Sequence, residues 1–303
     1  MKNSEYHIPV LLRAATDALV NDVNGDYVDV TFGGGGHSDA ILHLLSTGRL
    51  ISFDHDGDAL VNHIDDERFQ LVRQNFRNLQ NVLDANGFGL VNGILADLGV
   101  SSFQFDQPNR GFSFRFDARL DMRMNQDSSL TAFEIINSYD EDRLLNLLMR
   151  FGEFKKIEAD RIVAKVLDRR TLSPIETTFQ LTECIDFLVP AKVRNQFLAR
   201  VFQALRIEVN QEMVALIEFL NQVSKCLLPG GVVAIITYHS LEDRLVKNFF
   251  KSGNIDGVVD KDFFGVISKP FTLINKKPIV PTALEVKENS RARSAKLRIA
   301  KMN

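Results

Sequence analysis

Three side chains that could hold a small ligand, Asp54, Phe76 and Asp97, follow separate apolar segments of the sequence. Four consecutive glycines, Gly33–Gly36, follow an earlier segment of the same kind. Continuous apolar segments of this length are typical of buried parallel strands. Because ligands bind outside the carboxyl ends of such strands, we expect these features to meet at one rim of a sheet. There a carboxylate can accept from a ribose, an aromatic ring can cover a base, and glycine lets backbone approach a ligand.

The glycine run connects a predicted strand to a predicted helix, whose N-terminus would suit a carboxylate or a phosphate. The loop does not match the dinucleotide-binding pattern G-x-G-x-x-G. When the pattern begins at Gly33, its third glycine would have to be residue 38, which is a serine. A Walker loop fails because Asp29–Ser38 contains no lysine. A ligand with a carboxylate and an adenosine but no phosphate fits better, and S-adenosylmethionine is such a ligand. The alternative is a turn that serves packing alone.

Two of the three side chains, Asp54 and Phe76, have a second interpretation. Asp54 lies 21 residues after Gly33, where an acidic residue would hold a ribose diol, but it could instead cap the next helix. Asp56 is the nearest rival for the ribose. Phe76 would cover the adenine, or it would belong to the core. Asp97 ends the fourth predicted strand, beside the place where a reacting group would lie.

The elements that must position these residues are those of a doubly wound α/β protein. Six segments predict strands, at 27–32, 50–54, 69–73, 91–97, 232–237 and 295–300. A long helical stretch interrupts them and predicts an inserted helical domain over 108–204, with 1–107 and 205–303 forming the sheet domain. Helices are expected to begin at Ser173 and near Phe202, the second running to about Leu228.

Composition excludes several classes of protein. The 303 residues carry a net charge of −3, which is not that of a strongly basic nucleic-acid binder. Cys184 and Cys226 are isolated, so neither a zinc site nor a disulfide framework is expected. No secretion signal and no membrane-spanning run stands out, which favours a soluble, cytoplasmic protein. His37, Asp54, His55 and Asp56 are close in the sequence, but strand alternation would scatter them, so no metal site is expected.

The segment after Asp97 is unusually long for a strand-to-helix connection, and long structured loops are usually functional. Its arginines alternate with phenylalanines, a combination that suits an unpaired base and its phosphates. In the alternative, a buried lid, the arginines pair with aspartates of the same segment. The arginines are Arg110, Arg115, Arg119 and Arg123.

Two further regions are locally basic, and one histidine could be chemically active. Arg143–Arg170 holds eight Lys/Arg against four Asp/Glu, and Glu285–Asn303 holds six against two. Arg291, Arg293 and Lys296 could therefore meet phosphate. His239 follows the fifth predicted strand, where a catalytic role is one possibility. Its neighbours Ser240 and Asp243 are expected to form a capping box.

Eight motifs, in this order and nearly end to end, resemble those of the RsmH (MraW) family of bacterial 16S rRNA cytosine-N4 methyltransferases. They are His7–Leu12, Thr31–Ser38, Asp97–Ser102, Arg110–Phe114, Leu120–Met124, Phe202–Ile207, His239–Arg244 and Arg291–Ser294. The resemblance implies a class I methyltransferase with a seven-stranded, mostly parallel sheet and a helical substrate-recognition insert. It implies S-adenosylmethionine as methyl donor and a cytidine N4 in the decoding (P-site) region, within the small ribosomal subunit, as acceptor.

The resemblance also assigns roles to residues. Cofactor contacts carry over to Gly35, Gly36, His37, Asp54, Phe76, Asp97 and Gln104, and the loop reasoning adds Gly33. Asp97 or a nearby backbone carbonyl would accept a hydrogen bond from N4, while a splayed base would rest on the Arg110–Met124 loop. This chain departs from the family in Arg13-Ala14, in Gly152-Glu153-Phe154 and in Tyr238, which replaces a phenylalanine. Another RNA or protein acceptor, a non-catalytic RNA-binding relative and a homodimer are left open.

Overall fold

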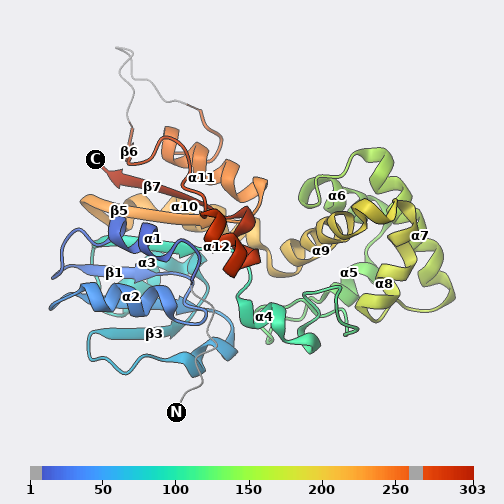
Figure 1. The fold of residues 1–303 in the computed structure, drawn as a ribbon, viewed down its shortest axis with the longest axis horizontal. Coiled ribbons are helices and arrows are strands. Elements are labelled where there is room, and N and C mark those ends of the chain that lie inside the picture. The colour runs from blue at the N-terminus through green and yellow to red at the C-terminus, as the bar shows by residue number, and fades with distance from the viewer. Residues whose placement is uncertain (1–8, 259–268) are drawn as a thin grey trace. The chain divides into compact units, whose positions relative to one another are not determined.

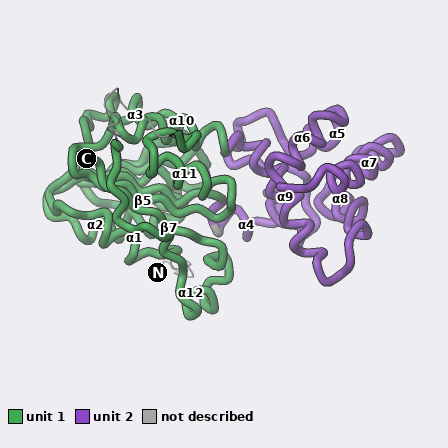
Figure 2. The backbone as a smooth tube through the Cα atoms, turned by 90° about the horizontal axis from the view of Figure 1, so that it is seen from above, with its two compact units in different colours: residues 1–99, 213–303 green, residues 100–212 purple. Residues whose placement is uncertain are grey.

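The computed structural model describes residues 9–258 and 269–303, so His7 of the first motif lies outside the described residues. The chain forms two compact units, coloured separately in Figure 2. The first comprises Met1–Gly99 and Met213–Asn303, and the second comprises Val100–Glu212. The sequence places the insert at 108–204, and the second unit is wider than that at both ends.

The first unit is built on a seven-stranded sheet in the order β3-β2-β1-β4-β5-β7-β6. Neighbouring strands from β3 through β5 run parallel, whereas β7 runs antiparallel to both β5 and β6. This is the mostly parallel, seven-stranded sheet that the family resemblance implies, and its strand β6 was not among the six segments predicted as strands. The strands are β1 Asp26–Asp29, β2 Arg49–Asp54, β3 Phe69–Arg73, β4 Val91–Asp97, β5 Leu227–Thr237, β6 Phe271–Leu273 and β7 Lys296–Met302.

The central strands are buried on both faces, which explains their continuous apolar sequences. In β4 only Asn92 and Asp97 are partly exposed, and in β5 every residue from Gly231 to Thr237 is buried. β5 begins five residues earlier than predicted, at Leu227 instead of Val232, because Leu227 already pairs with Val91 of β4.

Helices cover both faces of this sheet (Figure 1). Helices α1 and α2 pack together on one face, and α3 and α10 lie on the other. The helices of this unit are α1 Leu12–Leu19, α2 Gly36–Leu44, α3 Leu79–Ala85, α10 Glu212–Cys226, α11 Ser240–Ser252 and α12 Ala283–Glu288. Short 3-10 turns are η1 Gly57–Asn62, η2 Phe76–Asn78 and η6 Ser290–Ser294.

The second unit is helical around its own apolar core. Its helices are α4 Ser102–Asp106, α5 Ala132–Ser138, α6 Glu141–Phe151, α7 Lys156–Leu172, α8 Thr178–Ile185 and α9 Arg194–Asn210, with 3-10 turns η3 Pro108–Arg110, η4 Asp186–Leu188 and η5 Ala191–Val193. Helix α6 is strongly amphipathic: Leu144, Leu147, Leu148 and Phe151 recur at helical spacing and are buried. Among the described residues, no helix is both long and apolar enough to cross a lipid bilayer.

Two predicted helix boundaries in this region are wrong. Ser173 does not begin a helix but ends α7, and α8 follows the N-cap Thr177. Thr177 and Gln180 cap each other's backbone N–H groups, which makes the competing start stronger than Ser173. The predicted long helix is broken at Gln211, whose φ of 50° is left-handed, so α9 ends there and α10 begins.

Candidate functional site

The glycine loop connects β1 to α2 as predicted, and two of its glycines have left-handed backbones. Gly33 has φ 52° and Gly35 has φ 81°, conformations that cost other residues free energy. Gly35 is the N-cap of α2, and no side chain caps that end in the described structure. The first turn of α2 therefore keeps backbone N–H groups that could bind a carboxylate.

Asp54 ends β2 and fastens the glycine loop to it. Its Oδ2 accepts from the backbone N–H of Gly33 at 2.8 Å, and its Oδ1 accepts from that of Asp56 at 2.9 Å. Each carboxylate oxygen has a second lone pair, so a ribose hydroxyl could still be accepted. Burial raises the pKa of Asp54. Asp54 does not cap the helical turn that follows. That turn, η1, is capped by Asp56, whose side chain accepts from the backbone N–H of Asp58.

Phe76 lies in η2, directly after β3, and is half-buried. Its ring meets Phe219 of α10 edge to face, with centroids 5.6 Å apart. Such a contact fixes the ring without covering both of its faces. The contact of Phe76 with an adenine therefore stays a prediction, while its packing against Phe219 is observed.

Asp97 ends β4, where two hydrogen bonds hold it and His37 lies beside it. Its Oδ1 accepts from the hydroxyl of Tyr238 at 2.8 Å, and its Oδ2 lies 3.7 Å from Nδ1 of His37. Its backbone N–H donates to Oγ1 of Thr31 at 2.6 Å. Burial raises the pKa of Asp97 to about 6, although His37 and the Tyr238 hydrogen bond oppose that rise. The carboxylate keeps 22% of its exposure, so an incoming group could reach it.

His37 is buried in the first turn of α2, and its contacts define its tautomer. Its Nε2 lies 3.2 Å from the carbonyl oxygen of Val10, which can only accept, so Nε2 carries the hydrogen. Burial lowers the pKa of His37, so the neutral ring prevails near pH 7. Its Nδ1 then bears a lone pair and cannot donate to Asp97. Both atoms that face each other across 3.7 Å are acceptors.

Sequence reasoning missed a buried aspartate beneath the loop. Asp29 ends β1 and accepts from the hydroxyl of Ser38 at 2.6 Å and from the backbone N–H of Thr31 at 3.0 Å. Ser38 in turn contacts the hydroxyl of Ser52 in β2, at 2.9 Å. Burial raises the pKa of Asp29, which is fully buried. A signal was available, since Asp29 precedes the glycine run in an apolar strand, where an acidic residue is unusual.

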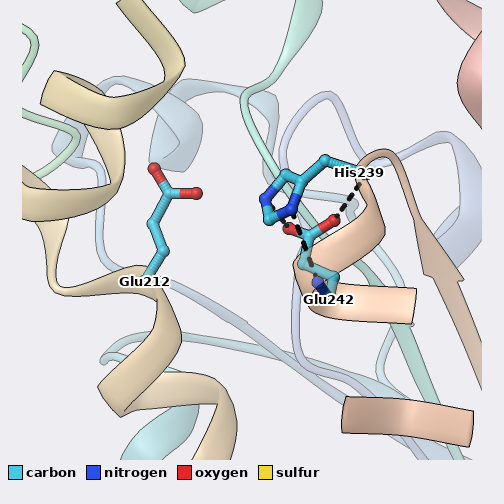
Figure 3. Close-up of side chains that lie close together, drawn as sticks. All are labelled: Glu212, His239 and Glu242. Atoms are coloured by element: carbon cyan, nitrogen blue, oxygen red, sulfur yellow. Dashed lines mark hydrogen bonds and ion pairs between the residues drawn. The ribbon is translucent and has the colours of Figure 1, made fainter. Parts of the chain in front are cut away.

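His239 occupies the N-cap of α11, so the predicted capping box is wrong. The box is formed by His239 and Glu242: Nδ1 of the histidine accepts from the backbone N–H of Glu242 at 3.4 Å, and Oε2 of the glutamate accepts from that of His239 at 3.3 Å (Figure 3). Asp243, assigned to the box by sequence, instead accepts from Arg298 at 2.7 Å and from Lys296 at 3.3 Å. Glu212, also drawn in Figure 3, belongs to the second unit and pairs there with Arg206 at 2.8 Å. The catalytic role of His239 stays a prediction, beside this observed capping role.

Two of the arginines predicted to bind RNA are held within their own loop. Arg110 is buried, and its guanidinium donates to the carbonyls of Arg123 and Met124 at 2.8 and 3.0 Å. Arg123 forms a two-pronged ion pair with Asp121, at 2.9 and 2.7 Å. These contacts favour the lid alternative for this pair of arginines.

The other predicted contacts are distributed over both units. Arg115 and Arg293 are exposed, while Arg291 is half-buried in η6. Lys296 pairs with Asp243, as described above. Gln104 is buried in the second unit, where it forms a capping box with Ser101. Its predicted cofactor contact is not tested by that geometry.

A family profile and the curated relatives assign the chain to one family. A profile of the MraW methylase family matches residues 4–303. The chain is 52% identical over 297 residues to the ribosomal RNA small subunit methyltransferase H of Flavobacterium johnsoniae, covering 98% of this chain and 97% of that protein. It is 52% identical over 302 residues to the protein of the same name from Parabacteroides distasonis, covering 99% and 98%. A solved rRNA methylase from Streptococcus thermophilus aligns with 95% of this chain and 91% of that one, at 12% identity and a TM-score of 0.41.

Proposed function

Because the chain belongs to the MraW methylase family, we propose that it transfers a methyl group from S-adenosylmethionine to the N4 amino group of one cytidine in the decoding region of 16S rRNA. Its relatives carry the name of small-subunit rRNA methyltransferases, which supports the class of RNA. The acceptor would be presented within the small ribosomal subunit, in the cytoplasm. The cytosine N4 and its location come from the motif series in the sequence.

One observation carries the chemical part of the proposal. Asp97 is a carboxylate at the end of a central strand, next to the glycine loop, with its pKa raised to about 6. It is therefore ionised at neutral pH, yet retains affinity for a hydrogen. Such a group suits a reaction in which a weakly nucleophilic amine must lose one hydrogen.

The residues at this rim fit S-adenosylmethionine. The uncapped first turn of α2 offers N–H groups to the methionine carboxylate, and Asp54 offers lone pairs to the ribose hydroxyls. No lysine or arginine lies in Asp29–Ser38, consistent with a ligand that has no phosphate. When bound, the cofactor supplies an electrophilic methyl group on a sulfonium.

The chain's own contribution is position and a hydrogen acceptor. The lone pair of the cytosine amino nitrogen is conjugated into the ring, so the amine is a poor nucleophile. A hydrogen bond from N4–H to Asp97 favours a more pyramidal nitrogen, whose lone pair can attack the methyl carbon in line with the departing sulfur. The N–C bond forms as the C–S bond breaks. The nitrogen then releases one proton, which Asp97 accepts and passes to water.

The test uses small subunits that lack the modification and a donor with an isotopically labelled methyl group. Nucleoside mass spectrometry should find the label in N4-methylcytidine and in no other nucleoside. An Asp97→Asn variant is the matched control: it keeps the shape of the side chain but removes the charge. Label in another nucleoside or in protein would support a different acceptor. Absence of any S-adenosylmethionine binding would support a non-catalytic RNA-binding protein.

A further inference from the structure

Tyr238 is the residue that joins the end of β5 to the end of β4. Its backbone N–H donates to Oε2 of Glu242 at 2.8 Å, which fastens it to the start of α11. Its ring lies alongside Gly99, where an added Cβ would be 3.6 Å from Cδ2 of the tyrosine. Its hydroxyl reaches Oδ1 of Asp97 at 2.8 Å. Backbone, ring and hydroxyl are thus each held, so the phenol has a defined direction.

The two oxygens of Asp97 consequently have different surroundings. Oδ1 accepts the hydrogen of the Tyr238 hydroxyl. Oδ2 faces Nδ1 of His37, which is an acceptor because Nε2 of that ring carries the hydrogen toward Val10. Among the residues that the structure describes, none donates to Oδ2. This oxygen is left for a donor that comes from outside the protein.

We propose that Tyr238 is a positioning residue for methyl transfer, whose hydroxyl holds Oδ1 of Asp97 so that Oδ2 accepts the hydrogen of the substrate amine. This proposal rests on the proposed function, since it assigns Asp97 to the reacting amine. Tyr238 acts only through Asp97 and does not touch the substrate. Its hydroxyl stays protonated at working pH, because burial and the neighbouring Asp97 raise its pKa well above 10.

The charged groups around Tyr238 and Asp97 determine at which pH Asp97 ionises. Asp97 faces His37 of α2, Asp29 of β1 and Glu242 of α11, and both acids raise its pKa. Tyr238 faces Glu242, Asp97 and Glu285 of α12. His37 and the hydrogen bond from the phenol both favour the ionised form of Asp97, and the phenol is the one that donates to it. Removing it should make Asp97 harder to ionise.

The first experiment is Tyr238→Phe, with methyl transfer to unmethylated small subunits measured from pH 5 to 9. In the wild-type protein, kcat should fall at low pH as Asp97 becomes protonated, and we call this fall the acid limb of the pH profile. Loss of one hydrogen bond to the carboxylate should raise the pH of this limb by about one unit. At pH 6.5 kcat should fall roughly threefold, and the loss should approach tenfold near pH 5, while the affinity for S-adenosylmethionine changes less than about twofold. A variant with the wild-type pH profile, or one that loses cofactor affinity instead, would overturn the proposal.

A matched control is Tyr139→Phe, which removes another tyrosine-to-carboxylate hydrogen bond, to Glu208 at 2.9 Å in the second unit. It should leave the acid limb in place. A second test combines Tyr238→Phe with Asp97→Asn. Because Tyr238 acts through Asp97, the double variant should be no slower at pH 6.5 than Asp97→Asn alone, and a further loss of about threefold would contradict that route.

Failure of the proposed function and failure of the Tyr238 role would give different results. If the wild-type protein methylates no cytidine N4, the proposed function fails before any variant is compared. If it does so and Tyr238→Phe has the wild-type profile, only the positioning role fails. Should Tyr238→Phe not fold, 3-fluorotyrosine at this position keeps the ring and strengthens the donor. The acid limb should then move downward, and an unchanged limb would reject the role.

Discussion

Arg123 and Arg115 belong to the same loop, yet the structure predicts opposite consequences for replacing them by alanine. Arg123 is mostly buried against its own loop, whereas the side chain of Arg115 is exposed. The sequence treats both as candidates for contact with RNA. The structure makes the first a loop-holding residue and leaves the second as the candidate for phosphate contact.

The magnitude for Arg123→Ala follows from its contacts. Its guanidinium donates four hydrogen bonds: two to Asp121, one to the carbonyl of Gln126 at 2.8 Å and one to that of Ser128 at 2.7 Å. A hydrogen bond contributes about 0.5–1.5 kcal/mol net, and the side chain is 24% exposed, so values at the low end apply. We expect a loss of about 2 kcal/mol in the free energy of unfolding. Arg115→Ala should change it by less than about 0.5 kcal/mol.

Two assays separate the roles. Urea unfolding gives the free energy of unfolding, and binding to unmethylated small subunits between 50 and 200 mM salt gives the dependence of affinity on salt. Each lost phosphate contact should lower the slope of log affinity against log salt by about 0.7–0.9. Arg115→Ala should lower that slope, and Arg123→Ala should leave it unchanged under conditions where the variant is folded. A stable Arg123→Ala protein with a reduced slope would refute this reasoning.

Three further predictions concern the rim of the sheet. On the role proposed for Asp97, its carboxylate is the active form and its pKa is about 6, so activity should be present above pH 6 and fall tenfold for each pH unit below it; a rate that is flat from pH 5 to 8 would contradict this. Gly35→Ala should lower stability by about 1–2 kcal/mol, because φ is 81° and the new Cβ would lie 2.9 Å from the ring of Phe32, as thermal unfolding can check. Asp54→Ala should weaken S-adenosylmethionine binding at least tenfold by calorimetry, since it releases Gly33 as well as the ribose; wild-type affinity would exclude both roles.

The sequence by itself was sufficient for six of the seven strands, all but β6, and for the loop at the rim of the sheet. Buried parallel strands need continuous apolar segments, and such segments are visible without any structure. Because their carboxyl ends meet at one edge, Gly33, Asp54 and Asp97 could be brought together by reasoning from their places in the chain. The backbone conformations of Gly33 and Gly35 agree with that reading of the loop.

Helix boundaries were harder to predict from the sequence, because several local signals for a helix start can lie within a few residues of one another. Ser173-Pro174 and Thr177–Gln180 are both plausible helix starts, and the structure uses the second. Thr178 decides this choice, since its hydroxyl donates to the carbonyl of Phe116 and its N–H to that of Ala118. Those partners lie some 60 residues away, beyond the reach of a local pattern.

Only the tertiary structure decided which polar groups face one another. Tyr238 and Asp97 are 141 residues apart in the sequence. Neither sequence segment predicts that the tyrosine hydroxyl donates a hydrogen bond to one carboxylate oxygen of Asp97. The same holds for Arg123, whose alternation with phenylalanines suits RNA contact and loop pairing equally well until Asp121 is seen beside it. Strand periodicity is a property of neighbouring residues, whereas hydrogen-bond partners and pKa values depend on elements that meet only after folding. The sequence therefore predicted the rim where a ligand would bind, and the structure shows that Tyr238 donates to Oδ1 of Asp97 and not to Oδ2.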